Sequence, residues 1–174
     1  MSSPTLPPTL APLTGTPLPL AAARALARQH GLRERVLAYV TRQPDELLVF
    51  EHTAEYPEAG LQVPAGGLEP GETPEQAAMR ETWEETGLHL RGPVLLASWH
   101  WQRGEAGQVW HYVWLAAPPQ TPDTWSHRVT QGERDAGLTF LCRFAPRHSP
   151  DLTPGHGQEA ALPTLQTLLQ GESP

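Results

Sequence analysis

The sequence is poor in cysteine, in long apolar runs and in positive charge, and each shortage excludes a class of protein. Cys142 is the only cysteine in 174 residues, so an internal disulfide is excluded and a reducing compartment is expected. No stretch approaches the roughly 18 consecutive apolar residues that a membrane-spanning helix needs. The N-terminal segment lacks the basic start and the apolar centre of a secretory signal. We therefore expect a soluble, cytoplasmic protein of one domain.

The charge balance is acidic. The formal net charge is −7 and the isoelectric point is about 5.6. A protein of this kind has no basic field with which to attract a nucleic-acid backbone, so a nucleic-acid partner is not expected. An anionic small molecule can still bind, but only where local arginines or a metal ion bridge the like charges.

Proline marks the ends of the chain. The 20 prolines cluster toward the two termini, and near the start they alternate with threonine and small apolar residues. Because proline lacks a backbone donor, residues 1–22 are expected to form a flexible leader. Residues 23–174 are then expected to form the folded domain.

Apolar alternation and periodicity predict strands and helices that interleave along this domain. Strands are expected at residues 35–40, 46–50, 61–63, 94–102, 109–116 and 138–144, and helices at residues 21–29 and 158–169. A further helix is expected over residues 74–86, because Thr73 can cap its start, Pro74 suits its first position and Gly87 can end it. The elements lack the regular period of a doubly wound fold, which favours an α+β fold with a mixed sheet flanked by helices.

Three carboxylates share one face of the helix expected after Thr73. At 100° per residue, Glu81, Glu84 and Glu85 fall within an arc of about 100°. Three like charges so close together repel one another, and carboxylate oxygens are the ligands that Mg²⁺ and Mn²⁺ prefer. The pattern predicts a metal-binding helix. A lone Glu-x-x-Glu-Glu would be interpreted more simply as a solvated acidic helix after a glycine turn.

The wider pattern around these glutamates is more specific. Seven polar or glycine positions recur at fixed spacing, and their coincidence by chance is on the order of one in 10⁸; they are Gly66, Glu72, Arg80, Glu81, Glu84, Glu85 and Gly87. They resemble the Nudix box, G-x5-E-x7-R-E-U-x-E-E-x-G-U, in which U is a bulky aliphatic residue. Leu88 fills the last U, whereas Thr82 replaces the first. The resemblance implies a Nudix-type α/β/α sandwich.

The resemblance also implies roles for residues of the box. Glu81, Glu84 and Glu85, with the backbone carbonyl of Ala65, would bind one or more divalent ions, Mg²⁺ or Mn²⁺, that bridge a diphosphate. In an acidic protein, those metals would supply the positive charge that an anionic substrate requires. Arg80 and Glu72 would hold the metal-binding carboxylates in place.

The general base is left open by the resemblance, because its position varies within the family. Glu81 is one candidate, and Glu133, in a polar loop between two expected strands, is the preferred distal one. Asp135 is the next choice and Glu159 the third. An ordinary solvated turn is an equal alternative for this loop.

The function implied is cleavage of a phosphoanhydride bond in a nucleoside-diphosphate-linked small molecule, such as a nucleoside triphosphate, a nucleotide sugar or ADP-ribose. Residues outside the box select no subfamily. The alternative is a Nudix-fold module that binds a nucleotide without turning it over. Members of the family are commonly dimers, so a homodimer is expected.

Aromatic residues are concentrated in the hairpin expected at residues 94–116. Trp99 and Trp101 would share one face of its first strand, and Trp110 and Trp114 one face of its second. Stacking on a nucleobase is one interpretation, and packing across the strands is the simpler one. His127, beside the loop that contains Glu133, is likewise interpreted either as a phosphate contact or as part of a surface strand.

Overall fold

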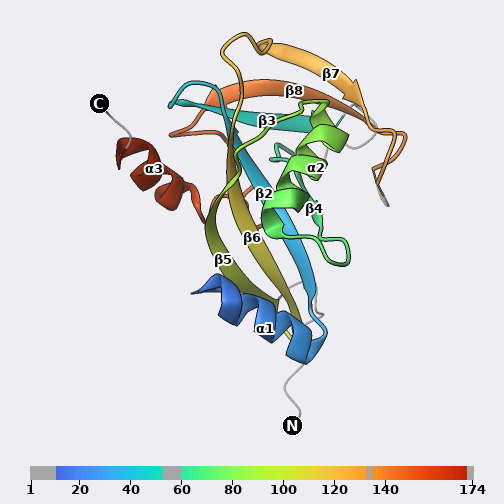
Figure 1. Cartoon of the computed structure of the whole chain (residues 1–174), viewed down its shortest axis with the longest axis vertical. Coiled ribbons are helices and arrows are strands. Elements are labelled where there is room, and N and C mark those ends of the chain that lie inside the picture. The colour runs from blue at the N-terminus through green and yellow to red at the C-terminus, as the bar shows by residue number, and fades with distance from the viewer. Residues whose placement is uncertain (1–10, 53–59, 133–134, 172–174) are drawn as a thin grey trace.

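A mixed β-sheet with helices packed against it forms the frame of the molecule (Figure 1). The computed structural model describes residues 11–52, 60–132 and 135–171. In these ranges the strands are β1 (Leu13–Leu18), β2 (Arg33–Thr41), β3 (Glu46–His52), β4 (Ala65–Gly67), β5 (Val94–Arg103), β6 (Ala106–Ala116), β7 (Thr124–Arg128) and β8 (Thr139–Pro146), and the helices are α1 (Leu20–His30), α2 (Pro74–Thr86) and α3 (Leu162–Gly171). The α+β architecture expected from the sequence is confirmed.

The sheet is built around a parallel pair of strands. Its order is β1-β5-β6-β2-β3-β8-β7, and β4 pairs with β2 outside this path. Strands β2 and β6 run parallel, whereas the other pairings are antiparallel. A parallel pair needs a long crossover, and here the crossover contains α2, which is thereby placed against the middle of the sheet.

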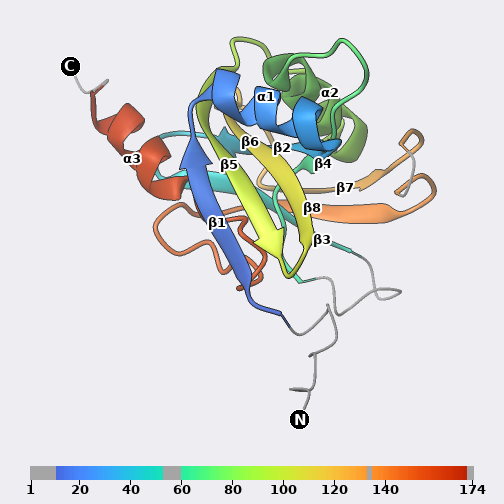
Figure 2. The same cartoon turned by 90° about the horizontal axis from the view of Figure 1, so that it is seen from below.

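The sheet separates the core into two layers, and alternate residues of β2 contribute to each layer. Val36 and Val40 of this strand pack in one cluster with Ala78 of α2. Leu37 points to the opposite face and packs in a second cluster with Leu165 of α3. Figure 2 shows α1 and α2 together on one side of the sheet. Helix α2 is therefore buried on its apolar side, and its other side is available to line a cavity.

Local chemistry sets both ends of α2. The Thr73 side chain accepts from the backbone N–H of Gln76, whose own side chain accepts from the backbone N–H of Thr73. This reciprocal cap and a proline in the first turn fix the start of the helix. Gly87 takes the left-handed conformation that ends it, with φ 78°. The helix predicted at residues 74–86 is confirmed.

The prediction of a flexible leader over residues 1–22 is wrong for the second half of that range. Leu13–Leu18 forms the edge strand β1, antiparallel to β5, and α1 begins at Leu20. The boundary expected between residues 22 and 23 therefore falls inside α1. Proline at position 17 is compatible with a strand because an edge strand need not donate from every backbone position. Residues 1–10 lie outside the described ranges.

Two short strands also differ from expectation. Residues 61–63 contribute only an isolated bridge from Gln62 to Phe50, and the strand lies at Ala65–Gly67 instead. Strand β7 was not predicted, because it is only five residues long and follows a proline-rich turn. No described helix is long and apolar enough to cross a membrane.

Candidate active site

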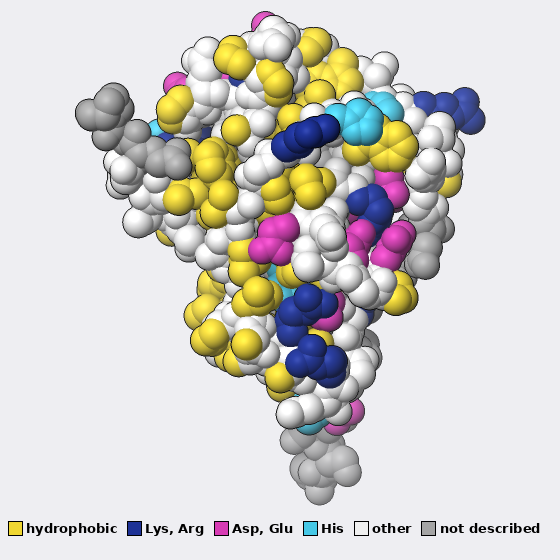
Figure 3. Space-filling model, viewed as in Figure 1, with side chains coloured by type: hydrophobic (Ala, Val, Ile, Leu, Met, Phe, Trp, Pro, Cys, Tyr) yellow, Lys and Arg dark blue, Asp and Glu magenta, His cyan; other side chains and the backbone are white. Residues whose placement is uncertain are grey.

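A cavity of about 700 Å³ opens beside α2. Five carboxylates line it: Glu81, Glu84 and Glu85 from the helix, Glu69 from the loop before the helix, and Asp135 from the segment between β7 and β8. Strand β4, from Ala65, lines the cavity as well. Figure 3 shows acidic side chains gathered around a basic one on the face that carries α2. The three glutamates that the sequence places on one helix face thus meet in one cavity.

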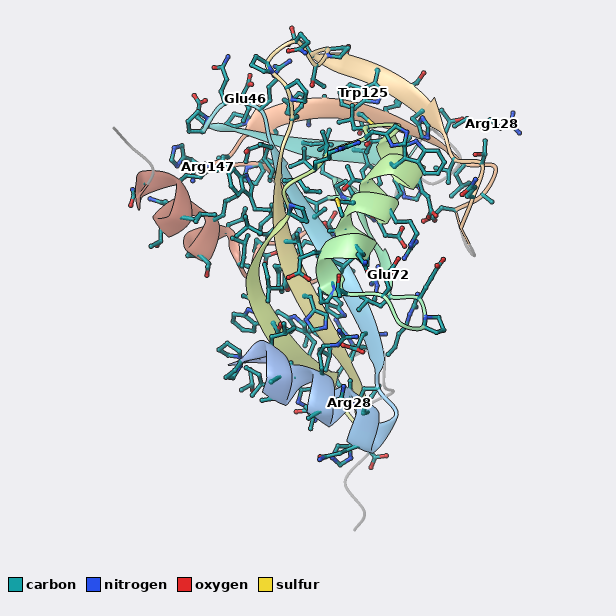
Figure 4. The ribbon with its side chains drawn as sticks, viewed as in Figure 1. Arg28, Glu46, Glu72, Trp125, Arg128 and Arg147 are labelled. Atoms are coloured by element: carbon teal, nitrogen blue, oxygen red, sulfur yellow. The ribbon has the colours of Figure 1, made fainter. Side chains whose placement is uncertain are left out.

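Arg80 ties these carboxylates to the loop before the helix. Its guanidinium makes a two-pronged ion pair with Glu72, with Nε–Oε2 and Nη2–Oε1 both 2.8 Å. Nη1 lies 2.8 Å from Glu81 Oε1 and 3.3 Å from Glu84 Oε2, and Nη2 donates to the carbonyl oxygen of Gly67 at 2.9 Å. Glu72 lies in the loop that leads into α2 (Figure 4). Arg80 and Glu72 are therefore positioned to orient the carboxylates, as the sequence predicts.

Glycine at position 66 allows the Glu81 carboxylate to approach the backbone. A Cβ atom placed on Gly66 would lie 2.1 Å from Glu81 Oε1, a separation that no side chain can tolerate. The neighbouring Ala65 N–H donates to Glu85 Oε1 at 3.0 Å. Strand β4 therefore fixes two glutamates, and the requirement for glycine in the box is steric here.

Burial and mutual repulsion make two of the carboxylates hard to ionise. Burial raises the pKa of Glu81 to about 7, with further raising by Glu84 and Asp135 and partial relief from Arg80. Burial also raises the pKa of Glu85 well above its ordinary value, and the charge of Glu81 adds to this. Arg80, by contrast, lowers the pKa of Glu72 through their hydrogen bonds. A cation beside Glu81 and Glu85 would relieve both causes.

The donor set fits a divalent cation on these grounds. Carboxylate oxygens suit Mg²⁺ or Mn²⁺, and positive charge offsets the cost of ionising Glu81 and Glu85 in a dry site. Within the described residues, no three such side chains already converge as a ready-made metal site. Arg80 contacts one oxygen each of Glu81 and Glu84, so the second oxygen of each carboxylate is not bound by its guanidinium.

The loop between β7 and β8 covers this cavity. Gln131, Gly132 and Asp135 line it, and a Cβ atom on Gly132 would lie 3.8 Å from Glu84 Oε2. Glu133, the preferred distal base, lies outside the described residues. Asp135, the second choice, lies close enough to raise the pKa values of both Glu81 and Glu85. Glu159 does not line the cavity.

Two arginines that line the cavity were not predicted from the sequence. Arg33 and Arg35 project from β2 on the same face as Leu37 and line the same cavity as the carboxylates. Their spacing of two residues in a strand was the available signal, since it places both side chains on one face. They supply the local positive charge that the acidic composition requires for an anionic ligand.

Two histidines, His111 and His127, have structural partners. His111 is fully buried, with Nδ1 2.7 Å from the Ser98 hydroxyl and Nε2 2.9 Å from Glu34 Oε1. His127 does not line the cavity; its Nε2 donates to the carbonyl oxygen of Glu84 at 3.0 Å, at the end of α2. The phosphate contact considered for His127 is therefore wrong in this structure, and the surface-strand interpretation holds.

Curated relatives match the box region. Human 8-oxo-dGDP phosphatase NUDT18 is 37% identical over 84 residues, which cover 48% of this chain and 24% of the relative. The RNA pyrophosphohydrolase of Yersinia enterocolitica is 40% identical over 68 residues, which cover 39% of this chain and 37% of the relative. The chain thus spans about a quarter to a third of the length of these relatives.

Solved structures with this fold, and a family model, extend the likeness to most of the chain. The Bacillus subtilis pyrophosphohydrolase BsRppH has a TM-score of 0.58 at 17% identity over 92% of both chains. A structure described as an ADP compounds hydrolase has a TM-score of 0.57 at 19% identity, covering 81% of this chain and 75% of the other. The model described as NUDIX domain matches residues 31–161. The chain belongs to the NUDIX domain family.

Proposed function

We propose that the protein is a metal-dependent hydrolase that cleaves a phosphoanhydride bond in a nucleoside-diphosphate-linked substrate. The observation that carries this proposal is the 700 Å³ cavity, which is lined both by the carboxylates of α2 and by Arg33 and Arg35. Carboxylates alone would repel a diphosphate, and arginines alone would bind it without a means to activate water. Together they fit a metal-assisted attack on phosphorus.

Glu81, Glu84 and Glu85 would hold the metal, with Mg²⁺ or Mn²⁺ as the fitting ions. When bound, such an ion supplies the positive charge that a diphosphate requires and polarises its phosphoryl oxygens. Arg80 keeps the helix carboxylates aligned through Glu72, and it has the reach to withdraw toward Glu72 when Glu81 and Glu84 take other partners. Arg33 and Arg35 would bind the outer phosphate oxygens.

A carboxylate must also take the proton of the attacking water. Glu81 lines the cavity beside Glu84 and Glu85 and is one candidate, a role open to it when it does not bind the metal. Asp135 also lines the cavity, and Glu133 lies two residues before it in the same loop. We propose Glu81 or a carboxylate of this loop as the base.

The curated relatives support the same chemistry, since their names refer to a nucleoside diphosphate and to RNA pyrophosphate hydrolysis. The alternative is a module that binds nucleotides without hydrolysis. Five carboxylates in one cavity favour the enzyme, because binding alone needs no group that activates water.

A substrate screen separates the two. Purified protein with Mg²⁺ or Mn²⁺ is incubated with nucleoside triphosphates, nucleotide sugars, dinucleotides and ADP-ribose, and the phosphate esters and pyrophosphate formed are separated by anion-exchange chromatography and quantified. We expect turnover of at least one, lost in Glu85→Gln and retained in Glu75→Gln, which changes a carboxylate on the same helix outside the cavity. Tight binding of a nucleotide with no turnover of any compound would establish the binding module instead.

A further inference from the structure

A second cavity, of about 450 Å³, adjoins the carboxylate cavity. The two share Arg35, Gln62, Val63 and Ala65 as lining residues, so they lie directly beside one another. A volume of this size is within the usual range for small-molecule sites. A ligand held at the carboxylates can therefore extend into this second space, here called the side cavity.

Two tryptophans form the walls of the side cavity, and both are held in place. Trp101 Nε1 donates to the Tyr112 hydroxyl at 3.0 Å, and that hydroxyl donates to the carbonyl oxygen of Gly157 at 2.6 Å. Trp110 Nε1 donates to Gln108 Oε1 at 2.8 Å. The indole N–H groups are thus satisfied within the protein, and the rings have fixed orientations.

Close packing confines Trp101 further. A Cβ atom on Gly15 of β1 would lie 2.6 Å from its ring, and one on Gly157 would lie 2.9 Å from it. The rings of Trp101 and Trp110 lie 5.7 Å apart and are inclined at 48°. Two glycines therefore allow backbone to press against Trp101 from separate segments of the chain. A rigid aromatic wall of this kind binds a flat ring at low cost in side-chain entropy.

The charge of the side cavity is opposite to that of its neighbour. Among the described residues that line it there is no aspartate or glutamate, whereas Arg35 and Arg103 both contribute. Arg35 lies at the junction: its guanidinium carbon is 5.5 Å from the centre of the Trp110 ring, and its charge lowers the pKa of Glu85. A cation therefore stands between the aromatic wall and the carboxylates.

We infer that the side cavity binds the nucleobase of the substrate against the Trp110 ring, with Trp101, itself stacked on Trp99, as the fixed neighbour of that ring and Arg35 holding the phosphate next to the nucleoside. This inference rests on the proposed function and specifies it: the substrate carries an aromatic base, and the scissile anhydride lies on the far side of Arg35 from that base. A free diphosphate or a sugar phosphate without a base leaves the side cavity empty.

Binding of a nucleoside monophosphate tests the inference without turnover, since such a compound contains no anhydride. Its dissociation constant is measured by titration calorimetry with Mg²⁺ present, beside that of ribose 5-phosphate, which lacks the base. Stacking on an aromatic side chain is worth about 1–3 kcal/mol per base, so Trp110→Leu should weaken nucleotide binding by roughly five- to a hundredfold. Binding of ribose 5-phosphate should stay within about twofold of wild type.

Two further variants test whether weaker binding by Trp110→Leu comes from a folding defect. Trp114→Leu removes a tryptophan from the same strand outside either cavity, and it should leave both dissociation constants unchanged. Ala106→Trp narrows the side cavity while keeping both tryptophans of its wall, and it should weaken nucleotide binding alone.

The inference is overturned if Trp110→Leu and Ala106→Trp bind the nucleotide as wild type does, or if both ligands weaken equally. These measurements are independent of the hydrolysis screen. Loss of base-dependent binding in the variants supports the side cavity even where the screen detects no turnover, so the two proposals fail separately.

Discussion

At the residue scale, one glycine decides how closely a carboxylate of the cavity can approach the backbone. Gly66 lies against Glu81, whereas the neighbouring Gly67 faces the end of the flexible Arg33 side chain, at 3.0 Å from a built Cβ. Alanine at 66 must push Glu81 aside, and alanine at 67 needs only a small movement of Arg33. The two adjacent glycines thus provide a variant and its control.

We expect Gly66→Ala to lower kcat/KM by roughly 100-fold, the order of loss that follows a misplacement of about 1 Å at a catalytic group. Gly67→Ala should keep kcat/KM within a few-fold of wild type. Steady-state kinetics on the best substrate of the screen, with circular dichroism to check folding, measure both. Equal activities of the two variants would show that contact between position 66 and Glu81 is unimportant.

Thr82 departs from the aliphatic residue that the box prefers, and the structure gives the cost. Its side chain is fully buried, and its hydroxyl has no hydrogen-bond partner among the described residues. A buried hydroxyl without a partner loses the hydrogen bonds it made in water. Thr86, one turn later, is buried too, but its hydroxyl donates to the carbonyl oxygen of Thr82.

Thr82→Val should therefore raise the free energy of unfolding by about 1 kcal/mol, because valine has the same shape without the hydroxyl. Thr86→Val should lower it by about the same amount, since a hydrogen bond is lost. Urea unfolding followed by fluorescence measures both. A destabilised Thr82→Val variant would mean that the hydroxyl has a partner, such as a buried water.

At the element scale, β7 holds the end of α2. Trp125 Nε1 donates to the carbonyl oxygen of Thr86 at 2.8 Å, and His127 donates to that of Glu84. Helix ends leave such carbonyls without partners inside the helix, so the strand satisfies them. Figure 4 shows Trp125 on the strand above the end of the helix. The carboxylate helix is thereby fixed at both ends, at Thr73 and at β7.

Trp125→Phe keeps most of the ring and removes its donor, so it should lower the free energy of unfolding by about 1 kcal/mol. Trp83→Phe is the matched control, because Trp83 packs its ring against His89 on the outer side of the same helix. Thermal and urea unfolding measure the difference. Equal losses in the two variants would indicate that ring size rather than the hydrogen bond matters.

A buried polar chain links α1 to the sheet through His111. Burial lowers the pKa of His111 from its ordinary 6.5, while Glu34 and Glu75 raise it and Arg24 lowers it. The unfolded chain therefore takes up a proton at this histidine at a higher pH than the folded protein does. Its contribution to stability is complete above about pH 6.5 and declines as the pH falls below that value.

We expect the stability advantage of the wild type over His111→Gln to shrink between about pH 7.5 and pH 5.5. Urea unfolding at a series of pH values measures the difference, and NMR titration of the imidazole reports its pKa directly. An advantage that grows as the pH falls would reverse the sign of the shift and contradict the burial argument.

Sequence reasoning recovered the elements whose signals are local. Helix α2 was predicted to the residue because its cap, its first proline and its final glycine all lie within the helix or beside it. Strand β1 was missed because its partner β5 lies far away in sequence, and β7 was missed because it is an edge strand of only five residues. The site divides in the same way between local and distant signals. The shared face of the glutamates can be predicted from helix geometry alone, whereas the position of Arg33 in the cavity depends on how β2 is placed in the sheet.

At the scale of the whole molecule, metal binding should couple to stability. A ligand that binds only the folded state at 100 times its dissociation constant adds about 2.7 kcal/mol. We expect Mg²⁺ or Mn²⁺ to raise Tm and a chelator to reverse the rise. Glu85→Gln should raise the stability of the metal-free protein, because it removes a buried carboxylate, and should abolish the response to metal.

Differential scanning fluorimetry across a metal series, with Glu75→Gln as the control that keeps the full response, measures this coupling. An identical rise in Tm for wild type and Glu85→Gln would place the metal elsewhere on the molecule.

The parallel pairing of β2 with β6 has a consequence for how the chain is made. The two strands are separated by more than sixty residues, and α2 lies between them in sequence. On the ribosome, the acidic helix is complete before one of the strands that it packs against has been synthesised. The part of the apolar side of α2 that packs against β6 stays exposed until β6 has been synthesised. Folding of the site should therefore come late in synthesis, and a chain truncated before residue 116 should be prone to aggregation.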